Sequence, residues 1–119
     1  MQFPKVNSVS NEDGCWRLSL LIESQLDAFK GHFDSAPIIP GVVQIQWALH
    51  FANECLPQNS KPSTSDSLSK RVECIEKLKF QNVIQPNMSV ILSLKEDKGR
   101  LEFSFESDKK HSSGKIVIS

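Results

Sequence analysis

The sequence predicts an α+β protein in which an antiparallel sheet wraps around one long helix. After Gly41 no further glycine or proline occurs before Pro57, and apolar residues recur between them at helical spacing. Short apolar or alternating segments precede and follow this stretch, as strands do. A chain of 119 residues is long enough for one hydrophobic core, so we predict a single domain over residues 1–119.

The part before the helix is expected to contain two strands and one helical turn. Trp16–Ile22 alternates and then becomes continuously apolar, which indicates a strand that enters the core. Gly14 suits the turn that would join this strand to an earlier, shorter one. Gln25–Lys30 is interpreted as a helical turn.

The long helix is predicted to run from Gly41 to Leu56. Two apolar stripes follow its spacing, so we expect the helix to be buried most of the way round. The first stripe comprises Val42, Ile45, Leu49, Ala52 and Leu56, and the second comprises Val43, Trp47 and Phe51. Pro57 ends the helix and opens a serine-rich segment without periodicity, which we interpret as a loop.

Three or four strands are predicted to close the chain as a meander around the helix. The segments concerned are Arg71–Phe80, Ser89–Lys95, Arg100–Glu106 and Ser113–Ile118. Lys98-Gly99 and Lys109–His111 have the character of turns between the last three. In Leu101–Glu106 the alternation is strict, so one face of that strand is expected to meet solvent.

Composition narrows the possible functions. The net charge is zero, which argues against general nucleic-acid binding. No apolar run approaches the ~20 residues of a membrane helix, and MQFPKVNSVS does not resemble a signal segment, so we expect a cytoplasmic protein without a membrane partner. The cysteines Cys15, Cys55 and Cys74 lack CxxC spacing, which favours free thiols over a metal site or disulfide.

The charge is unevenly distributed along the chain. Residues 1–67 contain four basic and seven acidic residues, whereas the remainder contains ten basic and seven acidic ones. A basic C-terminal half could receive an acidic carrier protein. Solvated strand faces would produce the same imbalance, so both interpretations stay open.

The segment FKGHFDSAPIIPGVVQIQW, residues 29–47, is the part of the chain most informative about function. It places a lone histidine in a Gly-His-Phe turn, followed by a short loop that ends in Pro-Gly at the start of the helix. This order can bring an imidazole opposite the free backbone N–H groups of a helix start. Such an arrangement suits removal of a proton next to a carbonyl group.

The same segment resembles the signature of the FabA/FabZ-type 3-hydroxyacyl-ACP dehydratases, which have the hot-dog fold. Gly31-His32-Phe33 and Pro37–Val42 match the family pattern. Pro40–Trp47 is similar to the ApeI-like dehydratases of aryl-polyene gene clusters, and weaker likeness extends over Val72–Pro86 and Ser112–Ile116. The resemblance implies a hot-dog domain that acts on acyl thioesters without a metal or an organic cofactor.

The resemblance also implies roles for individual residues. His32 would be the base that removes a proton from C2, because a neutral imidazole titrates near neutral pH. The backbone N–H of Gly41 would polarise the thioester carbonyl, since glycine allows close approach at a helix start. Phe33, Pro40 and Val42 would complete the substrate-binding site. Taken alone, a histidine in a turn is usually structural, and Pro-Gly is usually only a turn.

Two positions depart from the family pattern. Asp34 replaces a proline, and Gln46 replaces the Asp or Glu that the family supplies from a neighbouring subunit's helix. Glutamine keeps the shape and hydrogen bonding of glutamate but cannot transfer a proton. Three outcomes stay open: a slow dehydratase that uses water or His32 as the acid, a non-catalytic acyl binder, and a subunit active beside a partner that carries the carboxylate.

Gln46, His50 and Asn53 form a polar line on the predicted helix. This line could relay a proton through His50, or it could be satisfied by hydrogen bonds at a subunit interface. For a thioesterase, which generally needs a helix or loop carboxylate, the helix offers only Glu54 near its end.

We therefore predict a 3-hydroxyacyl-thioester dehydratase that forms a homodimer or a hetero-oligomer with a related hot-dog subunit. Its substrate would be carried on acyl carrier protein or CoA. The alternatives are a weakly active or non-catalytic carrier-binding subunit and an acyl thioesterase.

Overall fold

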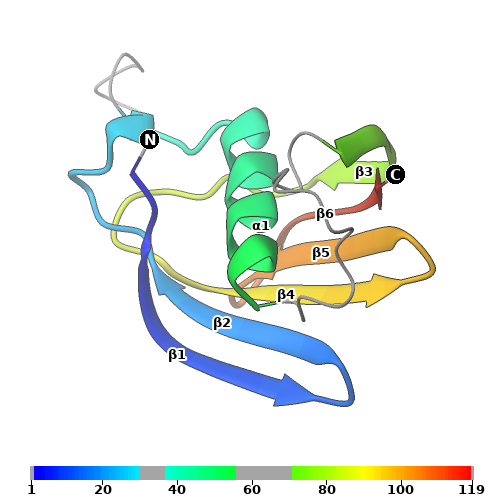
Figure 1. Ribbon diagram of the computed structural model, residues 1–119. Coiled ribbons are helices and arrows are strands. Elements are labelled where there is room, and N and C mark those ends of the chain that lie inside the picture. Colours follow the sequence, from blue (N-terminus) through cyan, green and yellow to red (C-terminus); the bar gives the residue numbers. More distant parts are fainter. Residues whose placement is uncertain (1, 30–36, 56–70, 119) are drawn as a thin grey trace.

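The computed structural model describes residues 2–29, 37–55 and 71–118. In these ranges one α-helix, α1, lies on one face of a curved six-stranded antiparallel sheet (Figure 1). This arrangement confirms the predicted α+β class. The predicted loop after Pro57 lies outside the described residues, as does most of the stretch between the helical turn and the helix.

The element bounds agree closely with the predicted ones. The elements are β1 (Lys5–Glu12), β2 (Cys15–Leu21), the 3-10 helix η1 (Asp27–Phe29), α1 (Gly41–Cys55), β3 (Val72–Phe80), β4 (Ser89–Asp97), β5 (Arg100–Glu106) and β6 (Lys110–Ile118).

The strands are arranged in the order β1-β2-β4-β5-β6-β3. The predicted meander is present as β4-β5-β6, whereas β3 pairs with β6 at one edge and β2 pairs with β4. Leu18 lies opposite Leu92, and Ile75 lies opposite Ile116. These pairings between distant segments place β1 and β3 at opposite edges of the sheet.

Two tight turns fix the register of the hairpins. Asp13 and Gly14 have φ angles of 52° and 82°, and Lys98 and Gly99 have φ angles of 51° and 77°. Successive residues with positive φ make the two-residue turn whose twist matches that of antiparallel strands. The predicted turns at Gly14 and Lys98-Gly99 are therefore confirmed.

Strand β6 begins at Lys110, three residues before the predicted start, so His111 belongs to the strand. The inward-facing residues at this end are His111 and Ser112, which are 2% and 1% exposed. The two ring nitrogens of His111 contact the carbonyl of Asn82 at 3.1 Å and the hydroxyl of Ser107 at 2.7 Å. The buried residues at the start of β6 are therefore polar, and His111 is hydrogen-bonded inside the fold. This part of the strand lacks the apolar alternation from which strands are predicted.

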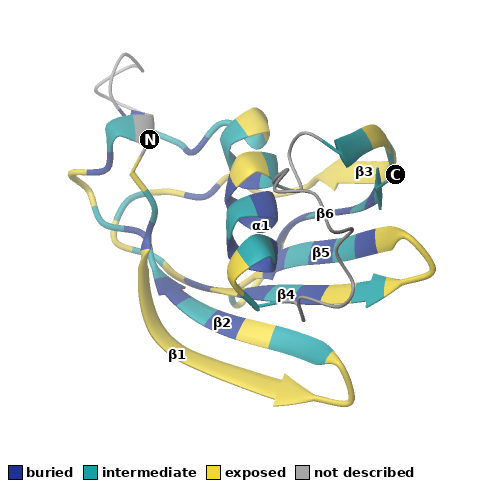
Figure 2. Ribbon diagram, viewed as in Figure 1, coloured by how far each residue is buried: buried dark blue, intermediate teal, exposed yellow. Residues whose placement is uncertain are grey.

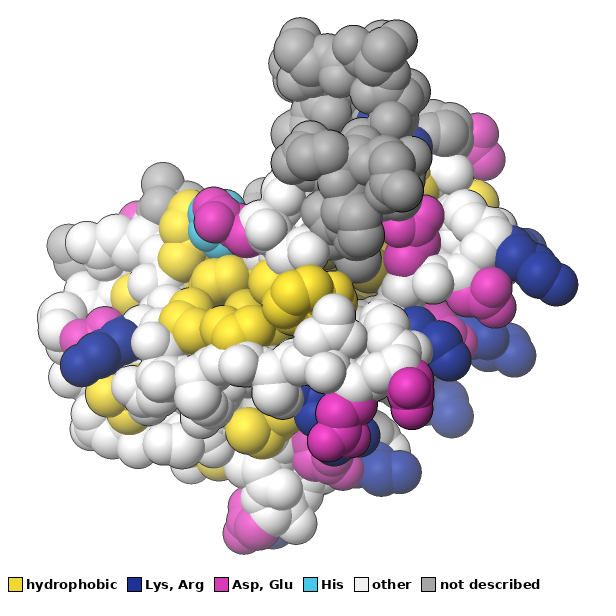
Figure 3. Space-filling model, turned by 60° about the horizontal axis from the view of Figure 1, so that its bottom comes forward, with side chains coloured by type: hydrophobic (Ala, Val, Ile, Leu, Met, Phe, Trp, Pro, Cys, Tyr) yellow, Lys and Arg dark blue, Asp and Glu magenta, His cyan; other side chains and the backbone are white. Residues whose placement is uncertain are grey.

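The core lies between α1 and the concave face of the sheet (Figure 2). In β5 the predicted alternation is confirmed, because Leu101, Phe103 and Phe105 are buried while the residues between them are partly exposed. Figure 3 shows a face on which hydrophobic side chains remain in contact with solvent in the single chain. The described residues therefore do not close the core completely.

The expectation that α1 is buried most of the way round is confirmed except on one flank, where Val42, Gln46 and Glu54 are exposed. The fully buried residues of the helix are Gln44, Trp47, Ala48, Leu49, Phe51 and Ala52. Val42 is 62% exposed, and Gln46, one turn further along, is also exposed. No other described segment covers this flank of the helix, which explains why an apolar residue such as Val42 remains at the surface.

The first described residues bind to two separate elements. Gln2 and Asp27 exchange hydrogen bonds between side chain and backbone, including one of 2.8 Å from the Asp27 N–H to the Gln2 amide oxygen. Phe3 stacks on His50 of α1, with ring centroids 3.6 Å apart and planes within 6°. The start of the chain therefore connects η1 to the helix.

Candidate functional site

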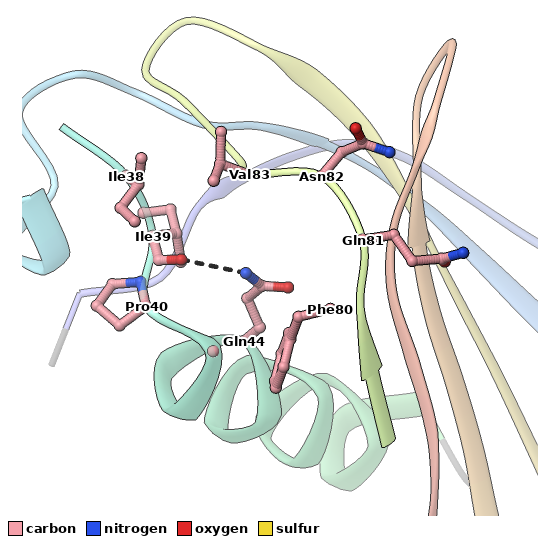
Figure 4. Close-up of a pocket in the computed structure, with 9 residues that line it drawn as sticks. Ile38, Ile39, Pro40, Gln44, Phe80, Gln81, Asn82 and Val83 are labelled. Atoms are coloured by element: carbon pink, nitrogen blue, oxygen red, sulfur yellow. Dashed lines mark hydrogen bonds between the residues drawn. The ribbon is translucent and has the colours of Figure 1, made fainter. Parts of the chain in front are cut away.

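A cavity of about 270 Å³ lies at the N-terminal end of α1 (Figure 4). Its walls come from the segment before the helix, the first turn of the helix, and the end of β3 with the residues that follow it. The lining residues are Ile38, Ile39, Pro40, Gly41, Gln44, Phe80, Gln81, Asn82 and Val83. Pro40 and Gly41, two of the predicted site residues, thus lie at this cavity.

Among the described residues, two backbone N–H groups in the first turn of α1 have no acceptor. The Pro40 carbonyl accepts hydrogen bonds from the N–H groups of Val43 and Gln44, at 3.1 and 3.2 Å. Within the described ranges no acceptor is found for the N–H groups of Gly41 and Val42. Free N–H groups at a helix start attract negative charge, so this end of the cavity suits an electron-rich oxygen.

The ring of Phe80 lies against Gly41. A Cβ atom at position 41 would be 2.5 Å from Cζ and 2.7 Å from Cε1 of that ring. These separations are too short for real contacts, so glycine is required for the present position of Phe80. The ring, rather than open space, occupies the volume that the missing side chain leaves.

Gln44 is a buried polar residue that sequence reasoning missed. Its side chain is 3% exposed, and its amide nitrogen donates to the Ile39 carbonyl at 3.1 Å (Figure 4). Its amide oxygen accepts a 2.6 Å hydrogen bond from the hydroxyl of Ser112. The N–H of Ile39 in turn donates to the Ile84 carbonyl at 2.9 Å, so the segment before the helix is held from both sides.

The other predicted site residues are not brought together at this cavity within the described part of the chain. His32 and Phe33 lie outside the described residues, together with Asp34. Val42 and Gln46 are exposed on the open flank of α1 rather than lining the cavity. One chain therefore presents Gln46 outward, where a second subunit could meet it.

His50 is engaged in packing. It stacks on Phe3, makes an edge contact with Phe51, and lies 3.9 Å from a carboxylate oxygen of Glu54. No hydrogen bond joins it to Gln46 in the segments that the structure describes. These contacts account for His50 without a proton relay.

The three cysteines are free, and Cys55 ends α1. Burial raises the pKa of the Cys55 thiol, and the neighbouring carboxylate of Glu54 adds to this effect. Its thiolate is therefore disfavoured in the folded chain.

Comparison with known proteins identifies the family. A family model described as ApeI-like, the ApeI dehydratase, matches residues 8–115. The chain belongs to the ApeI-like dehydratase family. No match is found among curated protein sequences.

Solved structures extend the comparison. A chain of the dehydratase heterocomplex ApeI:P from Xenorhabdus doucetiae is 30% identical, with a TM-score of 0.82 and coverage of 98% of both chains. An uncharacterised protein from Erwinia carotovora is also 30% identical, with a TM-score of 0.67 and coverage of 98% of this chain and 94% of the other.

A more distant structure confirms the predicted hot-dog fold. The dehydratase domain of PpsC from Mycobacterium tuberculosis, in complex with C12:1-CoA, is 12% identical and has a TM-score of 0.72. This ApeI-like chain is covered completely and spans 44% of the PpsC chain.

The match to the ApeI-like family includes both sides of the cavity, since it extends from β1 into β6. It also includes position 46, where this ApeI-like chain has glutamine. In the described residues no helix is long and apolar enough to cross a membrane. The same residues contain no cluster of three His, Cys, Asp or Glu side chains suited to a metal ion.

Proposed function

We propose that this protein removes water from a 3-hydroxyacyl thioester, carried on acyl carrier protein or CoA, to give a 2-enoyl thioester. The observation that carries the proposal is the match of residues 8–115 to the ApeI dehydratase model. The cavity at the start of α1 supports it. The cavity combines hydrophobic walls with helix-start N–H groups that have no acceptor among the described residues, and these groups can polarise a thioester carbonyl.

In the proposed reaction His32 takes the proton from C2, and the Gly41 N–H stabilises the negative charge that develops on the thioester oxygen. The C3–O bond then breaks as the C2–C3 double bond forms, and the hydroxyl leaves as water once it receives a proton. Gln46 orients the hydroxyl or a water molecule but cannot supply that proton. The proton comes back from His32, from water, or from a carboxylate of a second subunit.

We further propose that residues 1–119 form one hot-dog domain that works in an assembly with a second subunit. Exposed hydrophobic residues lie at the cavity and on β3, the strand at one edge of the described sheet, as expected for a surface that another chain covers. They are Val42, Leu78, Phe80 and Val83. The heterocomplex of the Xenorhabdus relative supports a related hot-dog subunit as the partner.

Docking of an acidic carrier protein is also part of the proposal. Ion pairs already engage part of the basic C-terminal half, because Arg100 contacts Glu76 at 3.1 Å and Lys115 contacts Glu102 at 3.2 Å. Carrier binding would therefore depend on the remaining basic residues of that half.

A second candidate function is an acyl-carrier-binding subunit with little or no activity of its own. Gln46 favours it, since losing a general acid lowers a rate by about 10²–10⁴. Nothing comparable favours a thioesterase. Glu54 lies 13 residues after Gly41 in α1, roughly 20 Å along the helix axis from the cavity, and its carboxylate faces His50.

The test is incubation of the full chain with 3-hydroxyacyl carrier protein and with 3-hydroxyacyl-CoA, followed by mass spectrometry of the carrier-bound acyl group. Loss of water supports the dehydratase. Release of free thiol would indicate a thioesterase instead. Binding of the acyl carrier without either product would assign the protein to the second candidate.

A further inference from the structure

Gln44 is the polar side chain that points into the cavity at the start of α1 (Figure 4). Gln81 and Asn82 also line the cavity, but their side chains are directed away from its interior (Figure 4), and the amide of Asn82 donates to the Lys110 carbonyl at 2.7 Å. The remaining lining side chains are hydrophobic. A polar group of a bound ligand would therefore meet Gln44 there.

The orientation of the Gln44 amide is fixed by its two partners. The Ile39 carbonyl can only accept a hydrogen bond, so the amide nitrogen must face it. The amide oxygen then faces Ser112, whose hydroxyl donates to it at 2.6 Å. The donor end of Gln44 is thus directed toward the segment that borders the cavity.

The same nitrogen has a second hydrogen to donate. An amide nitrogen carries two hydrogens, and the bond to Ile39 uses one of them. Over the described ranges no second acceptor is found. Because Gln44 is 3% exposed, bulk water does not satisfy this N–H, and an unpaired N–H in a buried site is unfavourable. An acceptor oxygen on a ligand in the cavity would pair with it.

The spacing of Gln44 from the helix start indicates which ligand oxygen that would be. Gln44 follows Gly41 by three residues, so it lies on the same side of the helix, about 4.5 Å further along the axis. If the N–H groups at the start of α1 hold the thioester carbonyl at C1, a substituent at C3 is the next position along the acyl chain that could reach Gln44.

We propose that Gln44 is a specificity-determining residue whose second amide N–H donates to the 3-hydroxyl oxygen of the substrate. This inference rests on the proposed function of the same site. An acyl chain without the hydroxyl would leave the N–H unpaired, so the cavity prefers hydroxylated chains. The same hydrogen bond stabilises the oxygen as the C3–O bond breaks, although the amide does not transfer a proton.

The test uses two unreactive ligands in which an amide replaces the thioester: 3-hydroxyhexanoyl-pantetheine amide and its hexanoyl counterpart. Binding of each to the full chain is measured by calorimetry. The wild type is expected to prefer the hydroxylated ligand about tenfold, as one well-placed hydrogen bond allows. Gln44→Met, which keeps the approximate shape of the side chain without a donor, is expected to remove this preference, so that both ligands bind with equal affinity.

Ser112→Ala is the matched control, because it removes the hydrogen bond at the other end of the same amide and leaves both donor hydrogens. It is expected to keep the preference for the hydroxylated ligand. The inference is overturned if Gln44→Met keeps the preference, or if Ser112→Ala loses it equally, since that result would assign Gln44 a structural role. Failure of the wild type to bind either ligand would overturn the proposed function itself, and this inference with it.

Discussion

The aromatic ring of Phe80 occupies the space that a side chain at Gly41 would need. The two residues come from different elements, since Gly41 begins α1 and Phe80 ends β3, and both line the cavity. A Cβ at position 41 would approach three ring carbons to between 2.5 and 3.0 Å. The absence of a side chain at the helix start therefore determines the shape of the cavity as well as access to the backbone N–H groups.

Gly41→Ala should displace Phe80 while changing the stability little. The ring is the far end of a side chain that is 51% exposed, so it can move, and alanine favours helix by up to about 1 kcal/mol over glycine. We expect weaker binding of acyl-pantetheine amides with a nearly unchanged free energy of unfolding in urea. In a Phe80→Ala background the same change should affect binding much less. Equal effects in both backgrounds would show that the two residues are not coupled.

His32→Ala should abolish dehydration without lowering the melting temperature, because a base at the site contributes little to the core. The expected loss is about 10²–10⁴ in turnover, measured by the formation of 2-enoyl product. A collapsed fold would instead mean that His32 is structural.

His50→Ala is the matched control, and it separates the two roles considered for His50. Loss of the stack on Phe3 should lower the melting temperature but leave turnover nearly intact. A large loss of turnover in a folded His50→Ala variant would favour the proton relay.

Gln46→Glu should increase dehydratase activity at least tenfold, on the scale that general acids contribute. Glutamate fits where glutamine fits, and covering of position 46 by a second subunit would raise the pKa of the new carboxyl, keeping part of it protonated near neutral pH. Turnover is measured with the assembly verified by light scattering. Equal or lower turnover in an intact assembly would mean that Gln46 does not replace a lost acid.

The protein should be at least a dimer at micromolar concentration, with the free strand β3 and the open flank of α1 in the interface. Val42→Lys should weaken this assembly, because it places a charge on a hydrophobic surface that the second chain covers. Val9→Lys is the matched control, because Val9 on β1 is 49% exposed and Val42 is 62% exposed. This change should not weaken the assembly. Light scattering decides, and a monomeric wild type would contradict the proposed assembly.

Cys55 should react with iodoacetamide more slowly than the exposed Cys74 in the folded protein, because the raised pKa of Cys55 reduces its thiolate fraction. In the unfolded chain the pKa of the Cys55 thiol has its ordinary value of about 9.0. The contribution of the neutral Cys55 thiol to the free energy of unfolding is therefore fully present below that pH, and it is lost as the pH rises further. Peptide mapping of alkylation measures the first effect. The difference in the free energy of unfolding between the wild type and Cys55→Ser, compared at pH 7 and at pH 10, measures the second.

Local signals made much of the fold predictable. The helix start at Gly41 and the turns at Gly14 and Lys98-Gly99 follow from residues that are adjacent in the sequence. The pairing of β3 with β6 depends on contacts between distant segments, which alternation does not specify. The exposure of Val42 could not be predicted either, since a helical stripe does not show how much of it the sheet will cover.

The candidate site was predictable only in part for the same reason. Pro40 and Gly41 belong to a recognisable signature, and they line the cavity. Gln44 lies within an apolar stretch, and its importance becomes visible only with its partners Ile39 and Ser112, the second of which is 68 residues away. The position of Phe80 likewise depends on the absence of a side chain at Gly41, which is far from it in the sequence.

The contacts of Gln2 and Phe3 have a practical consequence for producing the protein. Gln2 binds the turn at Asp27, a few residues before His32 in sequence, and Phe3 stacks on the helix that presents Gln46. An affinity tag fused close to these residues could disturb their contacts and shift η1 relative to α1. Purification handles should therefore be kept away from Gln2 and Phe3, and kinetic comparisons should use protein in which these two residues are unchanged.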